Sequence, residues 1–356
     1  MTVFLPLITA FFITIIATPI SLVFIRRMGL FDDPKTHKHP ASIHTKPVPR
    51  GGSIPLFFGV AFAGILFLPI TNITIALYLA GVIALITGVF DDKFNISPYL
   101  RFVINIICAL IVVGSGISIP FITNLTGGIL YLDAFKVSFD VFGQTIVILL
   151  SDIIALFWIV WVMNMLNWSK GVDGQMPGIV AISAVIIGIL SLNSSVLDQS
   201  NLTGTILAFI IAGASLGFLI FNFYPAKIFP GYGATAIYLL LSATAIMSSA
   251  KLATAILVMG VPMTDGIFTI FRRLLTGRSP FLHDKLHLHH LLLSIGMRQR
   301  SIALFYWTIS AILGSIALTL PNKAKLFAII MLFIVVSGGI FFLHYIIRKT
   351  HGKQNN

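Results

Sequence analysis

The chain has 356 residues, of which 57% are hydrophobic and only 10% are charged. Soluble proteins carry about 25% charged residues, so this composition excludes a soluble globular protein and indicates an integral membrane protein. The formal net charge of +12 would suggest nucleic acid binding in a soluble chain. In a membrane protein it favours loops that face anionic lipid head groups, and an anionic substrate, so we expect no nucleic acid partner.

Apolar runs of about 20 residues suit helices that cross a bilayer. The sequence predicts eleven such spans, at residues 4–25, 54–70, 72–90, 102–119, 145–163, 177–192, 205–221, 235–249, 252–270, 302–320 and 326–347. Long polar loops cover residues 26–53 and 271–301, and alternating apolar and polar residues predict an outer hairpin at about 121–143. No internal repeat or separate soluble domain is visible, so we expect one all-α polytopic membrane domain over residues 1–356.

The basic residues predict the orientation of these spans. No basic residue precedes the first span and Arg26-Arg27 follow it, which indicates an anchor with its N-terminus outside. The outer segments then hold only four of the 23 lysines and arginines, namely Lys136, Lys251, Lys323 and Lys325. We therefore expect a multi-pass plasma membrane protein whose candidate site faces the cytoplasm.

Two adjacent carboxylates, Asp91 and Asp92, follow the third span. The helix dipole repels carboxylates at this end, and an inner helix end normally carries Lys or Arg. All eleven acidic residues of the chain are aspartates, so carboxylate chemistry rests on few candidates. The pair predicts a site, although the two residues could also be the first solvated residues of a loop.

A second inner loop follows the fifth span and holds Asn164, Asn167, Lys170 and Asp173. The two asparagines share a helix face at membrane depth, where an unpaired amide costs about 2–7 kcal/mol. The glycines at 171, 174 and 178 predict a cradle of backbone amides for phosphate oxygens. Alternatively, Asp173 caps the sixth span.

Two further inner loops carry polar residues. Asn222 lies ten residues before Tyr232, which sits between two glycines after Pro230, and such irregular backbone at membrane depth usually lines a polar cavity. The last loop holds Arg278 and the His287, His289 and His290 cluster. Zinc and a solvated basic loop are alternatives there, but the donors favour an anion or a nucleotide.

Four motifs together resemble one family over the whole chain. They are the Asp-Asp pair, the Asn-x-x-Asn loop with Gly-Val-Asp-Gly, Asn222 before the Gly-Tyr-Gly turn, and His-Leu-His-His. The family is the polyprenyl-phosphate N-acetylhexosamine-1-phosphate transferases, which are related to the phospho-N-acetylmuramoyl-pentapeptide transferase. Arg278-Ser-Pro-Phe with Asp284 and the histidines resembles the branch that uses UDP-N-acetylglucosamine-type donors.

The resemblance implies an enzyme that starts a lipid-linked glycan of the cell envelope, such as a cell wall or O-antigen precursor. The lipid phosphate of a polyprenyl phosphate would attack the β-phosphorus of a UDP-sugar and release UMP, with Mg²⁺ as cofactor. A homodimer is possible. A catalytically silent relative that binds lipid phosphate or nucleotide sugar is an alternative, and a transporter is another.

The site residues follow from the same resemblance. The expected catalytic residues are Asp91, Asp92, Lys170 and Asp173, and the expected metal ligands are Asp92 and Asp173. The expected substrate-binding residues are Lys46, Arg50, Asn164, Asn167, Asn222, Tyr232, Arg278, His287, His289 and His290.

The sequence departs from the family pattern at two positions, where Lys170 and Tyr232 stand in place of aspartates. The second of these aspartates is the family's Mg²⁺ ligand. Two outcomes are open for an active site. Lys170 replaces the metal, with the Tyr232 hydroxyl donating a hydrogen bond to the diphosphate, or Asp92 and Asp173 still hold Mg²⁺.

Overall fold

The structure is a computed structural model that describes residues 3–32, 47–124, 127–141, 144–193, 199–248, 252–281 and 285–354. Helices dominate it. They are α1 (Phe4–Arg27), α2 (Ser53–Phe67), α3 (Asn72–Phe94), α4 (Pro98–Gly114), α5 (Leu150–Trp168), α6 (Gln175–Leu192), α7 (Gln199–Asn222), the 3-10 helix η1 (Tyr232–Ala234), α8 (Thr235–Met247), α9 (Leu252–Val258), α10 (Gly260–Leu275), α11 (Leu288–Ser294), α12 (Gln299–Thr319) and α13 (Asn322–Gln354). Every predicted apolar run overlaps one of these helices.

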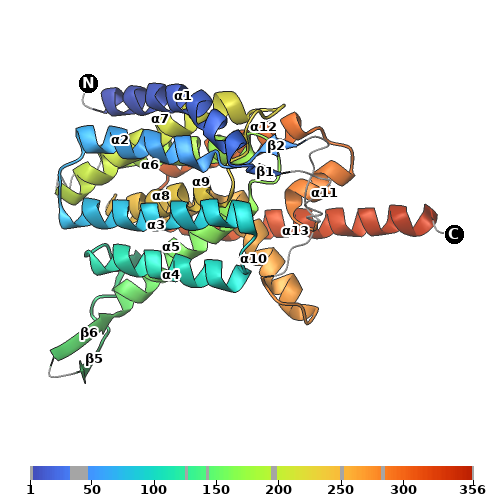
Figure 1. The fold of residues 1–356 in the computed structure, drawn as a ribbon. Coiled ribbons are helices and arrows are strands. Elements are labelled where there is room, and N and C mark those ends of the chain that lie inside the picture. Colours follow the sequence, from blue (N-terminus) through green and yellow to red (C-terminus); the bar gives the residue numbers. More distant parts are fainter. Residues whose placement is uncertain are drawn as a thin grey trace.

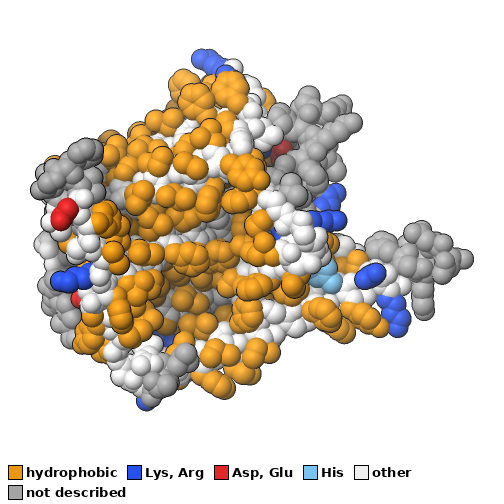
Figure 2. Space-filling model, turned by 90° about the horizontal axis from the view of Figure 1, so that it is seen from below, with side chains coloured by type: hydrophobic (Ala, Val, Ile, Leu, Met, Phe, Trp, Pro, Cys, Tyr) orange, Lys and Arg blue, Asp and Glu red, His pale blue; other side chains and the backbone are white. Residues whose placement is uncertain are grey.

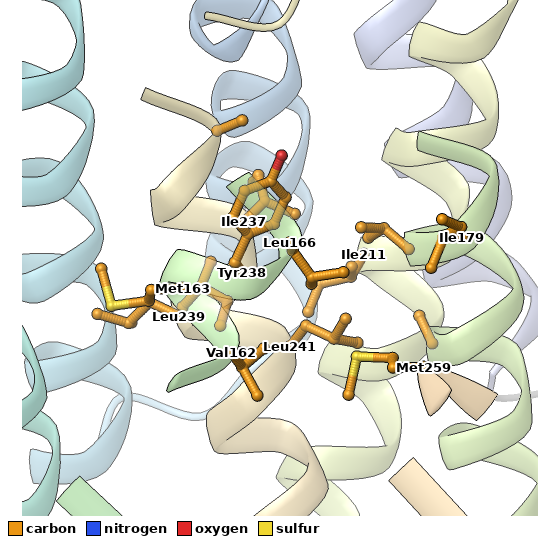
Figure 3. Close-up of a cluster of buried hydrophobic side chains, with 14 of the residues drawn as sticks. Val162, Met163, Leu166, Ile179, Ile211, Ile237, Tyr238, Leu239, Leu241 and Met259 are labelled. Atoms are coloured by element: carbon orange, nitrogen blue, oxygen red, sulfur yellow. The ribbon is translucent and has the colours of Figure 1, made fainter. Parts of the chain in front are cut away.

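The helices form a bundle in which α1 packs on α2 and α7, α6 packs on α7 and α12, and α5 packs on α8 (Figure 1). Its core is apolar. Figure 3 shows a cluster of buried apolar side chains that includes Met163, Ile211, Leu241 and Met259, all four fully buried. Close packing of large apolar side chains from several helices holds the bundle rigid, so its helix ends are fixed platforms for loops.

The outer surface of the bundle is also apolar. Hydrophobic side chains cover the middle of the face in Figure 2, and Lys and Arg lie at its edges. Ile16, Phe157 and Val335 each expose more than 60% of their surface, which suits contact with lipid rather than water. Among the described residues, seven helices are long and apolar enough to cross a membrane, or eight if a bent pair counts as one. The chain is therefore a polytopic membrane protein, while eleven crossings stay a prediction.

Residues 252–270, predicted as one span, form two helices with a sharp bend between them. Helices α9 and α10 meet at an angle of 83° around Met259. A proline inside a helix loses one backbone hydrogen bond and its ring collides with the carbonyl four residues earlier. Pro262 avoids both problems because it lies in the first turn of α10, where proline is tolerated.

The region predicted as one outer hairpin forms two. Strand β3 (Phe121–Thr123) pairs with β4 (Ile129–Tyr131), and β5 (Lys136–Val141) pairs with β6 (Gln144–Leu149), both antiparallel. The span predicted at 145–163 therefore begins as strand β6, since the run Thr-Ile-Val-Ile favours a strand, and α5 starts only at Leu150. Figure 1 places β5, β6 and the N-terminus at one end of the bundle and α11 and the C-terminus at the other.

Candidate functional site

Two loops far apart in the sequence are joined at the end of the bundle where α3 finishes. Strand β1 (Phe31–Asp32) pairs with β2 (Val48–Pro49), and the chain then turns through Arg50. The amides of Gly51 and Gly52 both donate to the Phe229 carbonyl, and the Phe229 amide donates to the Pro49 carbonyl. These backbone bonds hold Arg50 beside the loop that precedes η1.

Asp91 and Asp92 lie in the last helical turn of α3, which continues to Phe94. Both are buried, with 3% and 5% of their surface exposed, so the alternative of solvated loop residues is wrong. Arg101 Nη1 in α4 donates to Asp91 Oδ2 at 3.0 Å, and Arg50 Nε lies 2.8 Å from Asp92 Oδ1. These two guanidinium groups offset the burial of the carboxylates and the unfavourable helix dipole.

Tyr232 links this pair to Lys170. The Tyr232 amide donates to Asp92 Oδ1 at 2.9 Å. Lys170 Nζ donates to the Gly231 carbonyl at 2.8 Å and lies 5.7 Å from the centroid of the Tyr232 ring, while the Arg101 guanidinium lies 4.8 Å from the same centroid. The aromatic ring is thus a support for two cations.

The charge of Lys170 is finely balanced. Burial lowers the pKa of this amine most, and the positive charge of Arg50 lowers it further. The negative charges of Asp92 and Asp91 raise the pKa, and the result is a pKa of about 7. A lysine amine in water has a pKa of about 10.4. At neutral pH the group is therefore divided between ammonium and neutral amine, and a nearby phosphate would favour the ammonium.

The loop from Lys170 to Gly174 is fixed by the chain around residues 222–228. Asp173 Oδ2 accepts a hydrogen bond from the Ala226 amide at 2.9 Å. Asn222 Oδ1 accepts from the Gly174 amide at 3.1 Å, and Asn222 Nδ2 donates to the Ile228 carbonyl at 2.8 Å. Asn222 and Asp173 therefore shape the site by bonding to its backbone.

The predicted amide cradle and helix cap are wrong in these details. The Gly174 amide is already bonded to Asn222, and Gly178 lies inside α6 against Trp307. The N-cap of α6 is Gly174 in a left-handed conformation with φ of 76°, not Asp173. Glycine suits this φ because it has no Cβ.

The three histidines form a second cluster beside the same loop. His287 and His289 stack with an interplanar angle of 4° and ring centroids 5.8 Å apart, and the His289 and His290 rings are 4.2 Å apart. Burial, and the neighbouring His290 and His287, lower the pKa of His289 well below its usual range. His289 is therefore a neutral imidazole at neutral pH.

Asp265 in α10 holds this cluster in place. Its Oδ2 lies 2.9 Å from His287 Nδ1, and its Oδ1 accepts a hydrogen bond from the Leu288 amide at 3.0 Å. The bend between α9 and α10 places this buried carboxylate one turn into α10. Because the carboxylate accepts the Nδ1 proton, it fixes the orientation of the His287 ring.

The two clusters meet through the loop after α5. The centroids of the Trp168 and His287 rings are 6.1 Å apart, and a Cβ added at Gly171 would lie only 1.9 Å from His289 Nε2. Lys170, between them in the sequence, belongs to the charged cluster. One continuous site thus combines a cationic end and an imidazole end.

Known proteins are similar in sequence to this chain. The profile of glycosyl transferase family 4 matches residues 74–249. The chain is 29% identical over 338 residues to the probable undecaprenyl-phosphate N-acetylglucosaminyl 1-phosphate transferase of Bacillus subtilis (strain 168), covering 90% of this chain and 86% of that protein. The matched region, which runs from α3 to the end of α8, is thus similar to glycosyl transferase family 4.

Two further relatives agree. The decaprenyl-phosphate N-acetylglucosaminephosphotransferase of Mycobacterium tuberculosis (strain CDC 1551 / Oshkosh) is 29% identical over 362 residues, 93% of this chain and 86% of the relative. The undecaprenyl-phosphate alpha-N-acetylglucosaminyl 1-phosphate transferase of Escherichia coli (strain K12) is 27% identical over 305 residues, 82% of this chain and 76% of the relative. The family resemblance seen in the motifs is confirmed.

Some residues predicted for this family site lie elsewhere. Lys46 lies outside the described residues. Arg278 is exposed in the turn after α10, and the Asn164 side chain donates to the Val160 carbonyl of its own helix at 2.7 Å. Asn167 Oδ1 is buried with no hydrogen-bond partner in the described part of the chain, an arrangement that favours a ligand.

Sequence reasoning missed Arg101, Asn105 and Asp265. Asp265 offered a signal, since an acidic residue inside an apolar run is costly and usually functional. For Arg101 the sequence offered no signal beyond its positive charge. Asn105 Nδ2 donates to the Tyr232 hydroxyl oxygen at 3.1 Å, a contact across 127 residues that no local pattern reveals. This contact holds the hydroxyl oxygen against α4 as an acceptor and leaves its proton to be donated, so the hydrogen bond from Tyr232 to the diphosphate stays a prediction.

The metal-donor set is small. In the described ranges, no three His, Cys, Asp or Glu side chains are grouped as a metal site. Asp91 Oδ1 and Asp92 Oδ2 are two carboxylate oxygens of this site that are buried without a hydrogen bond from described residues. A Cβ added at Gly231 would lie 1.9 Å from Asp92 Oδ2, so that oxygen is packed against the loop backbone.

Proposed function

We propose that this protein transfers an N-acetylhexosamine-1-phosphate, or a related sugar-1-phosphate, from a UDP-sugar to a polyprenyl phosphate and releases UMP. The product would start a lipid-linked glycan of the cell envelope. The relatives from B. subtilis, M. tuberculosis and E. coli are named as transferases of this kind acting on undecaprenyl or decaprenyl phosphate.

One observation carries the proposal. Arg50, Arg101 and Lys170 gather around Asp91 and Asp92 at the end of an apolar bundle. Phosphoryl transfer needs little covalent help from a protein, since positioning and charge stabilisation supply most of the catalysis. Guanidinium and ammonium groups in a largely buried site provide both for phosphate oxygens.

The chemical step balances without an added base. An oxygen of the lipid phosphate forms a bond to the β-phosphorus of the UDP-sugar, and the bond from that phosphorus to the bridging oxygen breaks. UMP leaves with the bridging oxygen and its electron pair. The second pKa of a phosphate monoester is about 6, so the nucleophile is already ionised at neutral pH.

Asp91 and Asp92 then act by positioning. Asp91 fixes the Arg101 guanidinium, and Asp92 fixes Arg50 together with the Tyr232 amide. Each arginine has five N–H donors in a fixed fork, so donors remain for phosphate oxygens after these pairings. The carboxylates thus orient the cations that hold the reacting phosphates.

The imidazole end suits the nucleotide. His289 is neutral, and its Nδ1 is buried without a hydrogen-bond partner in the described structure. The neutral His289 ring can hydrogen-bond to an uncharged base, and the Trp168 and His287 rings offer faces for stacking. We therefore place uridine beside His287 and His289, and the diphosphate beside Lys170.

The lipid would reach the carboxylates from the membrane. Phe90, Phe94, Tyr99 and Leu100 each expose at least half of their surface around the turn from α3 to α4. Apolar side chains of this kind suit a polyprenyl tail.

The finer topology also belongs to this proposal. The charged site lies at the opposite end of the bundle from the β5–β6 hairpin (Figure 1). Eleven crossings with an outer N-terminus would place the site at the cytoplasmic face of the plasma membrane. A UDP-sugar is a cytoplasmic metabolite, which fits this side.

A transporter is the other function that one feature favours, because bent helices near bilayer depth often form substrate sites. Here the bend between α9 and α10 serves the histidines. The carboxylate that it places, Asp265, is bonded to His287 and Leu288. The bend between α9 and α10 is thus explained by the histidine cluster that we propose binds the nucleotide of a transferase substrate.

A panel of UDP-sugars tests the proposed function. Purified protein with undecaprenyl phosphate and UDP-N-acetylglucosamine should release UMP, and Asp91→Asn and Asp92→Asn should each abolish this release. Asp133→Asn, an exposed residue between β4 and β5, is the matched control and should keep the wild-type rate. Absence of UMP with every donor would mean a silent relative, and full activity in both inner variants would refute the role of the carboxylates.

A further inference from the structure

Mg²⁺ is the cofactor that the family resemblance implies, but the donors in this site do not suit it. Magnesium is usually held by one or two carboxylates together with substrate oxygens and water. Such a carboxylate must present a free oxygen to the ion. Asp91 and Asp92 are the buried acids beside Lys170 and Tyr232, so their surroundings decide the question.

Asp92 is held by the protein through Oδ1, and its Oδ2, which has no hydrogen-bond partner among the described residues, faces the loop backbone. Oδ1 lies 2.8 Å from Arg50 Nε and accepts from the Tyr232 amide at 2.9 Å. Oδ2 packs against Gly231 so closely that a Cβ there would be 1.9 Å away. Asp173, the other expected metal ligand, is turned to the Ala226 amide through Oδ2.

The charges around the pair are already balanced. Asp91 Oδ2 accepts from Arg101, so each carboxylate has its own guanidinium, and Lys170 adds a third cation whose pKa both carboxylates influence. A divalent cation placed here would be repelled by three positive groups at short range. Tyr232 stands at the position where the family resemblance implies a metal ligand, and its ring supports Arg101 and Lys170.

Building on the proposed function, we propose that Lys170, Arg50 and Arg101 bind the diphosphate of the nucleotide sugar in place of a divalent cation. An ammonium has three donors, and Lys170 spends one on the Gly231 carbonyl. Two remain for phosphate oxygens. Lys170 would bind phosphate oxygens as a compact positive charge, and the planar guanidinium groups of the two arginines would add directed N–H donors.

Binding of UDP to the purified protein tests this without requiring turnover. Isothermal titration should give the same Kd for UDP in excess EDTA and in millimolar Mg²⁺. Lys170→Ala should weaken UDP binding about tenfold or more in EDTA, since one charge-assisted contact is lost. Lys136→Ala, an exposed lysine on β5, is the control and should leave the Kd unchanged. UDP binding that fails in EDTA and returns with Mg²⁺ would overturn the proposal.

Mn²⁺ provides a direct readout of a metal site. Electron paramagnetic resonance with UDP present should detect no stoichiometric Mn²⁺ on the wild type, whereas Lys170→Asp combined with Tyr232→Asp should gain it. Stoichiometric Mn²⁺ on the wild type that Asp92→Asn removes would overturn the proposal even if the double variant does not fold. These results stand apart from UMP release, so an inactive protein with metal-free UDP binding would refute only the proposed function.

Discussion

A single buried carboxylate in α10, Asp265, connects a helix bend to the chemistry of the histidines. Its two oxygens accept from two different groups, His287 Nδ1 and the Leu288 amide. It therefore fixes both the rotation of the His287 ring and the start of α11. Asp265 is a positioning residue, since its carboxylate acts through the imidazole.

The change Asp265→Asn should weaken UDP binding about tenfold. Asparagine has one acceptor oxygen in place of two, so one of the two donors loses its partner at a cost of about 1–3 kcal/mol. The KM for the UDP-sugar should rise while the KM for the lipid phosphate stays unchanged. Asp152→Asn, in the first turn of α5, is the control. A change within twofold in Asp265→Asn would contradict this role.

The amine of Lys170 should react with acylating reagents at a lower pH than other lysines. Its pKa is lowered to about 7, so the neutral, nucleophilic form grows as pH rises from 6 to 8, and the ammonium that binds phosphate is lost over the same range. Mass spectrometry of the labelled protein should give a midpoint near pH 7 for Lys170, and UDP should protect it. A midpoint above pH 9 without UDP would be inconsistent with the buried amine.

At the scale of elements, the helices were predictable and their interruptions were not. Runs such as 72–90 reveal a helix because an apolar segment in lipid must satisfy its own backbone hydrogen bonds. The extension of α3 through Asp91 and Asp92 depends on Arg50 and Arg101, which come from other elements. The bend at Met259 had local signs in Gly260 and Pro262, but apolar periodicity alone does not separate a straight span from a bent one.

The contact between the loop after α5 and α11 depends on a glycine. In Gly171→Ala the new Cβ would lie 1.9 Å from His289 Nε2, so the ring or the loop must move, at a cost of about 1–3 kcal/mol. We expect a lower thermal midpoint and weaker UDP binding. Gly114→Ala is the matched control because nothing lies within 4 Å of its added Cβ. Identical behaviour of the two variants would show that the two clusters are not coupled through this contact.

For the whole molecule, the sequence predicted the class of protein and the end of the helix bundle at which the polar loops lie. Composition indicated a membrane protein, and the basic residues grouped the polar loops at one end, where the structure brings residues 47–53, 168–174 and 226–232 together. Which loops touch was beyond the sequence, because contacts such as Asn105 with Tyr232 depend on the packing of the bundle.

The orientation can be tested with single cysteines. In a Cys108→Ala background, Ser138→Cys on β5 should react with an impermeant thiol reagent in intact cells. Ser279→Cys, after α10, should react only when the membrane is opened. Labelling of Ser279→Cys in intact cells with protection of Ser138→Cys would reverse the proposed topology.

The central claim is that the β-phosphate travels with the sugar. Purified protein, undecaprenyl phosphate and UDP-N-acetylglucosamine labelled with ³²P at the β-phosphate provide the most direct measurement. We predict that the label moves into the lipid fraction in proportion to the UMP formed, and that undecaprenol without its phosphate accepts none. Label that remains in soluble UDP while the sugar enters the lipid would contradict the account, because the reaction would then be transfer of the sugar alone.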